Sequence, residues 1–466
     1  MFKFKKNWLM LISIISTTAA FADPISYIHG SGATVVDVNA PNASGLSHNQ
    51  YQNFNVSGKG LILNNSDTTS VTHVGNVAGN RNMAAGPASV ILNEVVSSNR
   101  SMLNGFIEVA GQKADVIVAN PNGITCSGCS FVNAGNATLT TGAVVKNADG
   151  SLKGLEVRSG DILIDNGGLN NAKNYAAILA KAIKINGVVQ AGAVRASAGQ
   201  FDYDTSTGAV TSLNKDGWEL FGPQYAIDVT QLGGISANSI ELIGNDIGLG
   251  VHNKGKLAAT NDIRITSSGV LMNEGAIEGP GVLVQSSGGG LTNQGTITAG
   301  MLVVQGINTS DIGAVTNNGV IQTNQADISA GQFTQSKKGE LSASSLAKVG
   351  AQSFTNAGKI QGTQVDIVSS SDLNNSGVIA AAALLNASAL NNMNNSGMMG
   401  SNGTANLIAG NKLANKGSCF LWSCTSGTLQ AETINIVAPN MKEINEIGGQ
   451  IITNSLHFNN QNIPLK

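Results

Sequence analysis

The sequence predicts an all-β chain wound into a right-handed parallel β-helix, and three observations support this fold class. Short apolar runs alternate with polar residues and are bounded by turns. A motif of an apolar residue, Asn-x-Gly and usually a second apolar residue recurs about every twenty residues. Charged residues make up 12% and aromatic residues 4% of the chain, so the core must consist of small and aliphatic side chains.

The repeat is clearest in its glycines, which are spaced 19 to 24 residues apart. They are Gly255, Gly275, Gly295, Gly319, Gly339, Gly358, Gly377, Gly397 and Gly417. One such coil cannot bury its apolar face, but coils stacked at about 4.8 Å align equivalent aliphatic side chains into a continuous core. Gly and Asn accept the positive φ of a corner, and stacked Asn amides can form a ladder. Hairpins in an antiparallel sandwich are the alternative; the constant spacing favours the β-helix.

The composition excludes several classes of protein. A mean hydropathy of +0.07 and a net charge of -2 argue against disorder, which requires low hydrophobicity and high net charge. The same charge balance gives no electrostatic footprint for nucleic acid, so we expect no nucleic-acid partner.

The N-terminus predicts export. Three lysines precede an apolar run that ends in Ala20-Phe21-Ala22, which is the pattern of a secretory signal peptide over residues 1–22, cleaved between Ala22 and Asp23. A membrane anchor is the alternative, but the run is shorter than the ~20 residues that span hydrocarbon. The general secretory translocase is therefore an expected partner.

The rest of the chain divides into three parts. Residues 23–145 have irregular strands and turns, and a cap is expected there because an open terminal coil exposes unpaired backbone groups. Residues 146–240 are transitional, with an excursion over Phe201–Leu220 that could be a hairpin covering one face. Residues 241–466 hold the repeat array.

Four segments carry a family resemblance. They are VILNEV (90–95), LNGFIEV (103–109), NPNGI (120–124) and FVNAGNATLTTG (131–142). Together they resemble the secretion domain of the filamentous-haemagglutinin type, the exported partner in bacterial two-partner secretion. The resemblance implies that residues 23–145 are this domain, with strands outside the helix, and that a cognate outer-membrane β-barrel transporter recognises it.

The resemblance also assigns a secretion motif. Asn120, Pro121, Asn122, Gly123 and Ile124 match the family's NPNGI element, which is expected to shape the domain for its transporter; Pro second and Gly fourth also predict a type I turn. A second family element, NPNL, falls at residues 80–83. Asn80 and Asn82 are kept there, while Arg81 and Met83 replace Pro and Leu.

The four cysteines form two closely spaced pairs, Cys126 with Cys129 and Cys419 with Cys424. Export to an oxidising compartment favours two local disulfides. Local pairing also avoids a long covalent loop that would obstruct passage of an unfolded chain through a pore. A redox site lacks its βαβ context, and a four-cysteine zinc site is a further alternative.

The search for catalytic patterns gives no candidate. Acidic residues occur singly, the histidines lack metal-ligand spacing, and nucleophile elbows, Walker loops and dinucleotide fingerprints are absent. We therefore expect no catalytic residues, no metal and no cofactor.

The expected function is that of a secreted or surface-exposed exoprotein that adheres to receptors or glycans on host or neighbouring cells. Alternatives are the N-terminal part of a haemolysin or of a contact-dependent inhibition toxin, and a carbohydrate-active β-helix enzyme. An acidic cluster on one coil face would favour the enzyme, and a flat face of Asn, Ser and Thr would favour adhesion.

Overall fold

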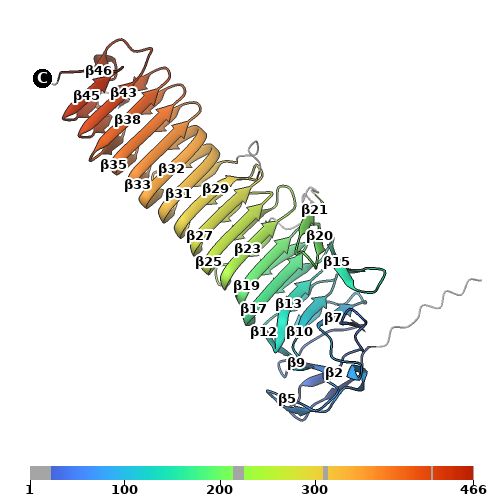
Figure 1. Cartoon of the computed structure of the whole chain (residues 1–466). Coiled ribbons are helices and arrows are strands. Elements are labelled where there is room, and N and C mark those ends of the chain that lie inside the picture. Colours follow the sequence, from blue (N-terminus) through green and yellow to red (C-terminus); the bar gives the residue numbers. More distant parts are fainter. Residues whose placement is uncertain (1–22, 214–224, 308–312, 421–422, 465–466) are drawn as a thin grey trace, which may run out of the picture.

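The computed structural model describes residues 23–213, 225–307, 313–420 and 423–464. Their strands wind into one elongated parallel β-solenoid of about 16 turns (Figure 1). Its helical elements are two short 3-10 turns, η1 (Arg81–Met83) and η2 (Ile444–Glu446). No helix in the described part of the chain is long and apolar enough to cross a membrane. The predicted β-solenoid is confirmed, because strands of successive coils pair in parallel.

Each coil contributes to three faces. Face 1 consists of short strands: β8 (Ser101–Leu103), β11 (Ile124–Cys126), β16 (Asp161–Ile164), β18 (Ala182–Ile185), β22 (Tyr225–Val229), β24 (Gly250–Asn253), β26 (Leu271–Asn273), β28 (Leu291–Asn293), β30 (Val315–Asn317), β34 (Leu373–Asn375), β36 (Met393–Asn395) and β39 (Leu413–Ala414). The chain then turns a corner into face 2 and continues into face 3.

Face 2 begins with β1 (Ser26–Ile28), antiparallel to β2 (Thr34–Asp37), and includes β4 (Leu61–Asn65), β9 (Phe106–Gly111), β12 (Cys129–Val132), β37 (Met398–Ser401), β42 (Thr428–Gln430) and β44 (Gln450–Ile452). Face 3 includes β3 (Leu46–Tyr51), β7 (Val90–Val95), β10 (Ala114–Ala119), β13 (Ala134–Thr140), β38 (Thr404–Ala409), β43 (Thr433–Val437) and β45 (Ser455–Phe458), which pairs antiparallel with β46 (Gln461–Asn462).

In the middle of the solenoid, single long strands bend through faces 2 and 3. These are β17 (Leu169–Ala180), β19 (Val188–Ala198), β23 (Gly234–Gly244), β25 (Lys256–Ser267), β27 (Ala276–Ser286), β29 (Thr296–Gly306), β31 (Val320–Gln335), β32 (Glu340–Asn356), β33 (Lys359–Ser369) and β35 (Val378–Ala389). The last residues of β31 and β32 extend onto face 1.

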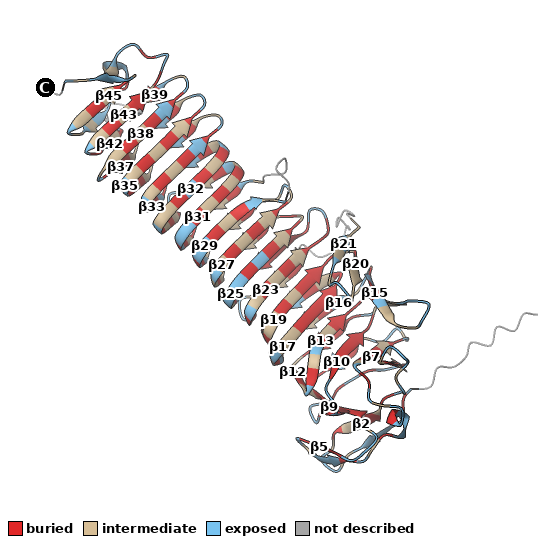
Figure 2. Ribbon diagram, in the orientation of Figure 1, coloured by how far each residue is buried: buried red, intermediate tan, exposed pale blue. Residues whose placement is uncertain are grey.

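The core is one aliphatic cluster that runs along the whole axis (Figure 2). Strand register aligns equivalent inward side chains, and on face 2 the aligned, fully buried residues are Ile235, Leu257, Ile277, Ile297, Ile321, Leu341, Ile360, Ile379, Met399 and Leu429. Burial of each such side chain contributes about 1.5–3 kcal/mol. The small, aromatic-poor composition therefore still builds a continuous core.

The Asn-x-Gly corners stack on one another. A Cβ atom on Gly275 would lie 2.0 Å from the carbonyl oxygen of Gly255, and one on Gly295 would lie 2.0 Å from that of Gly275. Glycine is therefore required at these corners by the close approach of successive coils.

Beside the glycines, the corner asparagines point inward and form a buried amide ladder. Asn273 Nδ2 donates to Asn293 Oδ1 at 2.7 Å, and Asn293 Nδ2 donates to Asn317 Oδ1 at 2.8 Å. The members are Asn253, Asn273, Asn293, Asn317 and Gln335, followed by Asn356, Asn375, Asn395 and Asn415. The corner after Gln335 is two residues longer, and the longer Gln side chain reaches Asn317.

The last predicted corner was placed wrongly. Asn415 joins the ladder as expected. The glycine at the corner, however, is Gly427 and not Gly417: a Cβ atom on Gly427 would lie 2.2 Å from the Asn395 carbonyl oxygen. The reason is an inserted antiparallel hairpin, β40 (Lys416–Phe420) and β41 (Ser423–Ser426), which separates the asparagine from its glycine.

A four-stranded antiparallel sheet lies outside the solenoid, in the order β14 (Ala143–Lys146), β15 (Leu152–Val157), β20 (Phe201–Asp204) and β21 (Val210–Ser212). Its apolar side packs on face 3, where Phe201 and Leu155 contact Ala177 and Leu179. The described part of the predicted excursion thus belongs to a sheet that covers one face; residues 214–220 of it lie outside the described residues. A second hairpin, β5 (Ser70–Thr72) and β6 (Gly75–Val77), projects near the N-terminal end.

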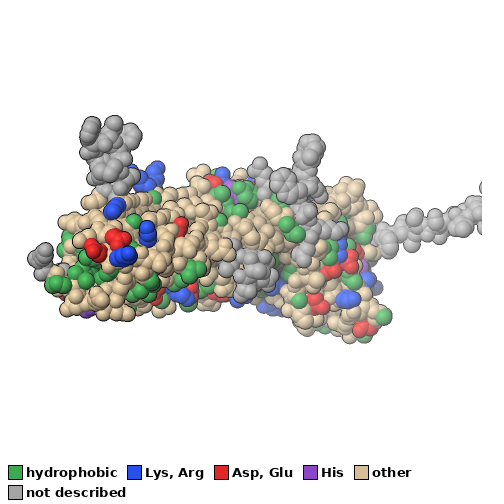
Figure 3. Space-filling view, turned by 90° about the horizontal axis from the view of Figure 1, so that it is seen from above, with side chains coloured by type: hydrophobic (Ala, Val, Ile, Leu, Met, Phe, Trp, Pro, Cys, Tyr) green, Lys and Arg blue, Asp and Glu red, His purple; other side chains and the backbone are tan. Residues whose placement is uncertain are grey.

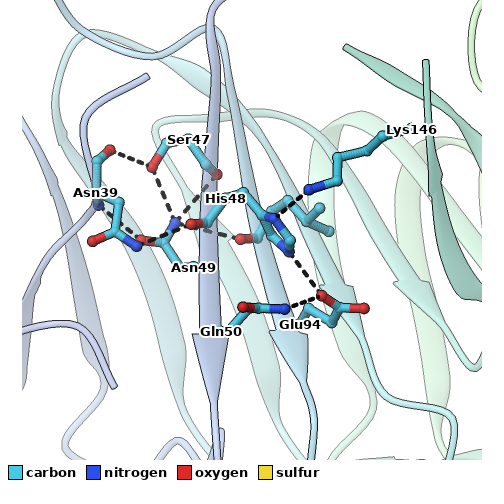
Figure 4. A network of polar contacts seen from close by, with 8 residues as sticks. Asn39, Ser47, His48, Asn49, Gln50, Glu94 and Lys146 are labelled. Atoms are coloured by element: carbon cyan, nitrogen blue, oxygen red, sulfur yellow. Dashed lines mark hydrogen bonds and ion pairs between the residues drawn. The ribbon is translucent and has the colours of Figure 1, made fainter. Parts of the chain in front are cut away.

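The N-terminal edge of face 3 is covered by side chains (Figure 4). The backbone of Asn39 donates to Asn49 Oδ1 at 2.8 Å, its side chain donates to the His48 carbonyl oxygen at 2.9 Å, and Ser47 Oγ donates to the Asn39 carbonyl oxygen at 2.6 Å. Groups on the free edge of β3 are therefore satisfied without another strand, as expected for a cap. The predicted signal peptide, residues 1–22, lies outside the described residues.

Candidate functional site

The corner at Asn120 connects β10 of face 3 to β11 of face 1. The Gly123 N–H donates to the Asn120 carbonyl oxygen at 3.0 Å, which closes the turn, and Gly123 adopts a φ of +105°. The Asn120 side chain accepts a hydrogen bond from the Asn122 N–H at 3.0 Å. Pro121 presets the backbone of the turn, and Gly123 supplies the positive φ that it needs.

Amide groups fix this corner to the preceding coil. Asn120 Nδ2 donates to the Asn99 carbonyl oxygen and to Ser101 Oγ, both at 2.9 Å, and Asn122 Nδ2 donates to the Ser97 carbonyl oxygen at 2.7 Å. Asn120 is fully buried. The short side chain of Asn120 carries an NH2 group with two donors, so it can bind both the backbone and one side chain of the preceding coil. This explains why asparagine occupies the position.

The corner at Asn80 repeats this geometry. The Asn82 N–H donates to Asn80 Oδ1 at 3.0 Å, Asn80 Nδ2 donates to the Val38 and Asn64 carbonyl oxygens at 2.8 and 2.9 Å, and Asn82 Nδ2 also reaches Val38. Met83 is buried. The two corners therefore share one hydrogen-bond pattern although Arg81 and Met83 replace Pro and Leu. Their role in secretion stays a prediction.

Sequence reasoning missed Arg100, which contacts the Asn120 corner from the neighbouring coil. Its guanidinium donates to the Ile124 carbonyl oxygen at 2.8 Å and to Asp161 at 2.8 Å. The two charges are separated by 61 residues. Only the register of β8, β11 and β16 brings them together, and no sequence spacing signals it.

Cys126 and Cys129 form a disulfide, with Cα atoms 5.3 Å apart, directly after the corner. Both cysteines are buried. The side chains of Cys419 and Cys424 lie outside the described residues, so the second disulfide stays a prediction; their backbones face each other in the β40–β41 hairpin.

A polar network connects the outer sheet to face 3 (Figure 4). Lys146 Nζ donates to His48 Nδ1 at 3.1 Å, and His48 Nε2 donates to Glu94 at 2.7 Å. Gln50 donates to the same carboxylate at 3.0 Å. Burial alone would raise the pKa of Glu94, but the hydrogen bonds from His48 and Gln50 and the charge of Lys146 outweigh it and lower this pKa below its ordinary value.

A cavity of about 470 Å³ lies on face 1, and its acidic groups are ion-paired. Asp161 is bound by Arg100, and His252 lies between Asp228 at 3.0 Å and Glu274 at 3.1 Å. Neither Asp in this cavity is therefore a free acid or base, which gives a glycosidase mechanism no support. Within the described ranges, no three His, Cys, Asp or Glu side chains gather as metal ligands.

Comparisons with known proteins agree with this architecture. The family model for the TPS secretion domain matches residues 22–279. A chain titled toxin CdiA from Yersinia pestis is 39% identical over 297 residues, covering 61% of this chain and 9% of the relative. Filamentous hemagglutinin from Bordetella pertussis is 34% identical over 280 residues, covering 58% of this chain and 8% of the relative.

A solved structure extends the match to the fold. The crystal structure of a filamentous hemagglutinin secretion domain aligns with a TM-score of 0.50 and 30% identity, covering 68% of this chain and 95% of the solved chain. The chain spans about a tenth of the length of the curated relatives.

Proposed function

Because the chain belongs to the TPS secretion domain family and is thus a two-partner-secretion exoprotein, we propose that a cognate outer-membrane transporter recognises its N-terminal region. The general secretory translocase delivers it to the periplasm, with cleavage between Ala22 and Asp23, and the transporter moves it to the cell surface or the medium. The family match over residues 22–279 carries this proposal. We assign recognition to residues 23–145, a transitional role to residues 146–240 and display to residues 241–466.

Within residues 23–145, the Asn120–Ile124 corner acts by shape and not by direct contact. Asn120, Gly123 and Ile124 are buried, and the exposed Asn122 directs its amide into the Ser97 carbonyl oxygen. A transporter cannot reach buried groups, but it can read the surface that they hold in place. We extend the same role to Asn80 and Asn82.

Direct contact is assigned to β1, the antiparallel edge strand of face 2. The Ile25 carbonyl oxygen accepts from the Asp37 N–H, and the His29 N–H donates to the Ala33 carbonyl oxygen. Because pairing alternates along an antiparallel strand, the backbone groups of Ser26 and Ile28 point away from β2. Ile28 is 68% exposed. This edge suits the addition of a transporter strand, with side chains such as Ile28 supplying apolar contact.

Strand addition is tested with Ser26→Pro and the control Ser26→Ala in the full chain. Proline removes the outward N–H without removing a bond to β2. We expect at least a tenfold drop in the amount of chain in the medium for the proline variant, with the chain retained in the periplasm and its β-sheet circular dichroism unchanged. Secretion of both variants at the native level would refute contact through β1.

The dependence on a transporter is tested by deleting the two-partner transporter genes of the source bacterium one at a time. Loss of the chain from the medium in one deletion, restored by the plasmid-borne gene, is expected. Continued secretion in every deletion would overturn the proposal.

We further propose that the exported array acts in adhesion. On face 1 one outward row is uncharged and consists of Thr292, Thr316, Thr334, Thr355, Asn374 and Asn394. On face 3 a second row, Asp366, Asn386, Asn406 and Asn435, is joined by amide hydrogen bonds of 2.8 Å. Most of the surface seen in Figure 3 is polar and uncharged, and the charged side chains gather in a few groups. A flat, regular, polar surface of this kind supports multivalent contact with receptors or glycans.

Adhesion is tested with the secreted chain and host or neighbouring cells. Binding should fall when Asn386 and Asn406 are changed to Glu, while an equivalent double change to Gln preserves it. Equal binding by both variants would contradict adhesion through face 3.

The second candidate is the N-terminal part of a contact-dependent inhibition toxin. The favouring observation is the 37–39% identity to chains titled CdiA, of which this chain covers about a tenth. Sequencing of the gene's mRNA is the direct test, since a toxin requires a reading frame that continues far beyond residue 466.

A further inference from the structure

Arg100 lies across the strand that follows the Asn120 corner. It directly precedes β8, and its guanidinium extends over β11 toward β16, two coils further along face 1. Arg100 Nε donates to Thr125 Oγ1 at 2.8 Å, and Nη2 donates to the Ile124 carbonyl oxygen at 2.8 Å. One side chain thus holds the last residue of the motif and the residue after it.

Asp161 fixes the guanidinium from the far side. Nη1 donates to Asp161 Oδ1 at 2.9 Å and Nη2 to Oδ2 at 2.8 Å, in the two-pronged geometry that arginine forms with a carboxylate. The side chains are 31% and 56% exposed. An ion pair this exposed adds little stability on its own, so its main effect is on orientation.

Gly123 leaves the space that the guanidinium occupies. A Cβ atom at this position would lie 2.4 Å from Arg100 Nη1 and 2.9 Å from the Asp161 carbonyl oxygen. The glycine of the motif therefore has two reasons to be present: its φ of +105° and the room it gives to Arg100.

We propose that Arg100, oriented by Asp161, is a positioning residue of the secretion motif. Asn120 and Asn122 attach the corner to the preceding coil, and Arg100 attaches it to the following coil, so that the surface offered to the transporter has one shape. This inference rests on the proposed function of the Asn120–Ile124 corner.

The test measures secretion of full-chain variants in the source bacterium, beside the thermal unfolding midpoint of each purified variant. Arg100→Gln is expected to lower secretion at least tenfold with a midpoint within about 2 °C of the native chain. Asp161→Asn should lower it less, because the bonds to Ile124 and Thr125 remain. Arg100→Lys should recover only part of the secretion, because an ammonium cannot bridge three groups in one plane.

The matched control is Lys348→Gln, which removes another partly exposed coil-to-coil ion pair, Lys348 with Asp327 at 2.9 Å, far from the motif. Its secretion should stay within twofold. Native secretion of Arg100→Gln, or a loss that merely follows a lowered midpoint, would overturn the inference. Asn122→Ala distinguishes the two proposals. Normal secretion of this variant would refute the role of the Asn120–Ile124 corner in secretion. Blocked secretion of Asn122→Ala together with native secretion of Arg100→Gln would refute only the role of Arg100.

A double variant tests the contact with Gly123 directly. If Gly123→Ala acts partly by displacing Arg100, it should lower secretion less in the Arg100→Ala background than in the native chain, because only the backbone strain and the contact with the Asp161 carbonyl oxygen then remain. An equal loss from Gly123→Ala in the two backgrounds would show that the two positions act independently.

Discussion

At the residue scale, the corner asparagines have two distinct uses. In the array they form an inward ladder in which Nδ2 donates to the Oδ1 of the next coil, as Asn273 does to Asn293; the ladder is interrupted after Gln335, whose amide donates to the Lys359 carbonyl oxygen. In the N-terminal region, Asn120 instead donates to the backbone and a serine of the coil before it. The first oxygen of such a ladder receives no amide from a preceding coil: Asn253 Oδ1 is buried without a partner, whereas Asn356 Oδ1, where the ladder restarts, accepts from the Gly358 N–H.

Breaking the ladder should destabilise the coils on both sides. Asn293→Leu leaves the Oδ1 of Asn317 buried without a donor, and an unpaired group of this kind costs about 1–3 kcal/mol. It also removes one acceptor of Asn273 Nδ2, which keeps the Thr296 carbonyl oxygen at 3.2 Å. We expect faster amide hydrogen exchange over residues 271–320. The control is Asn394→Leu, because Asn394 is exposed and pairs on the outside with Asn374; its effect should stay within about 0.5 kcal/mol. Equal effects would refute the ladder as a source of stability.

The disulfide should matter for stability and little for export. Replacing Cys126 and Cys129 with serine opens a very short loop, worth about 2 kcal/mol in the unfolded chain. Protease digestion around residues 120–132 should accelerate, while the secreted amount stays within twofold, because the loop is local. A large secretion defect in this variant would show that the bridge has a role in recognition.

Sequence reasoning predicted the turn at Asn120–Gly123 and the corner glycines because both follow from the local backbone. The partners of these residues could not be predicted. Arg100 and Asp161 are far apart in the chain, and their contact depends on the register of three coils. Only the pairing of strands determines that register.

At the element scale, the outer sheet is held to face 3 by apolar packing and by the Lys146–His48–Glu94 network. The pKa of Glu94 is lowered in the folded chain. Its contribution to stability is therefore complete above the ordinary carboxyl pKa and is lost as the pH falls through the lowered value.

This gives a pH prediction for residues 143–157. At pH 7, Glu94→Gln should increase their amide exchange about tenfold over the native chain, because a hydrogen bond to a charged group contributes about 1.5–3 kcal/mol. At low pH the difference should shrink, once the pH has fallen through the lowered pKa and Glu94 in the native chain is protonated. The control Glu432→Gln removes an exposed carboxylate and should change neither ratio. A difference that persists unchanged as the pH is lowered until the native chain begins to unfold would argue against the charge of Glu94.

Elements were predictable where the repeat is regular and not where it is interrupted. The β40–β41 hairpin separates Asn415 from Gly427. Asn415 and Gly417 match the Asn-x-Gly pattern of a corner, but the chain begins the hairpin there and forms the corner at Gly427. Tyr203 and Trp218 did suggest that the excursion over residues 201–220 covers one face, but its pairing with the strands at residues 143–157 in one sheet was not predicted.

At the scale of the whole molecule, the constant period near twenty decided the fold. Antiparallel hairpins do not require a constant number of residues between turns. Stacked coils do, because each coil must place its corner directly on the corner of the preceding coil. In a parallel solenoid each coil forms its backbone hydrogen bonds with the coils before and after it in the sequence. The coils can therefore fold one after another, in the order in which they leave the transporter.

Folding as an aid to transit predicts a specific secretion defect. Stacking one coil contributes about 1–3 kcal/mol to the free energy of unfolding. Return of the chain into the transporter pore then becomes several-fold to about a hundredfold less frequent. Ile297→Asp buries a charge in the core and should lower the secretion rate several-fold, whereas Thr298→Asp, at the exposed position beside it in β29, should not. An unchanged rate for Ile297→Asp would remove folding from the mechanism.

The stacked glycine corners have a mechanical consequence. The backbone of each glycine corner contacts the backbone of the preceding corner directly. No side chain lies between them, so the distance between the two corners cannot change with the size of a side chain. The spacing along that edge is thus fixed, and bending toward it is resisted. A rod built in this way gains about 5 Å of reach for each additional twenty residues while its thickness stays constant, so chain length alone sets how far from its point of attachment the tip can stand.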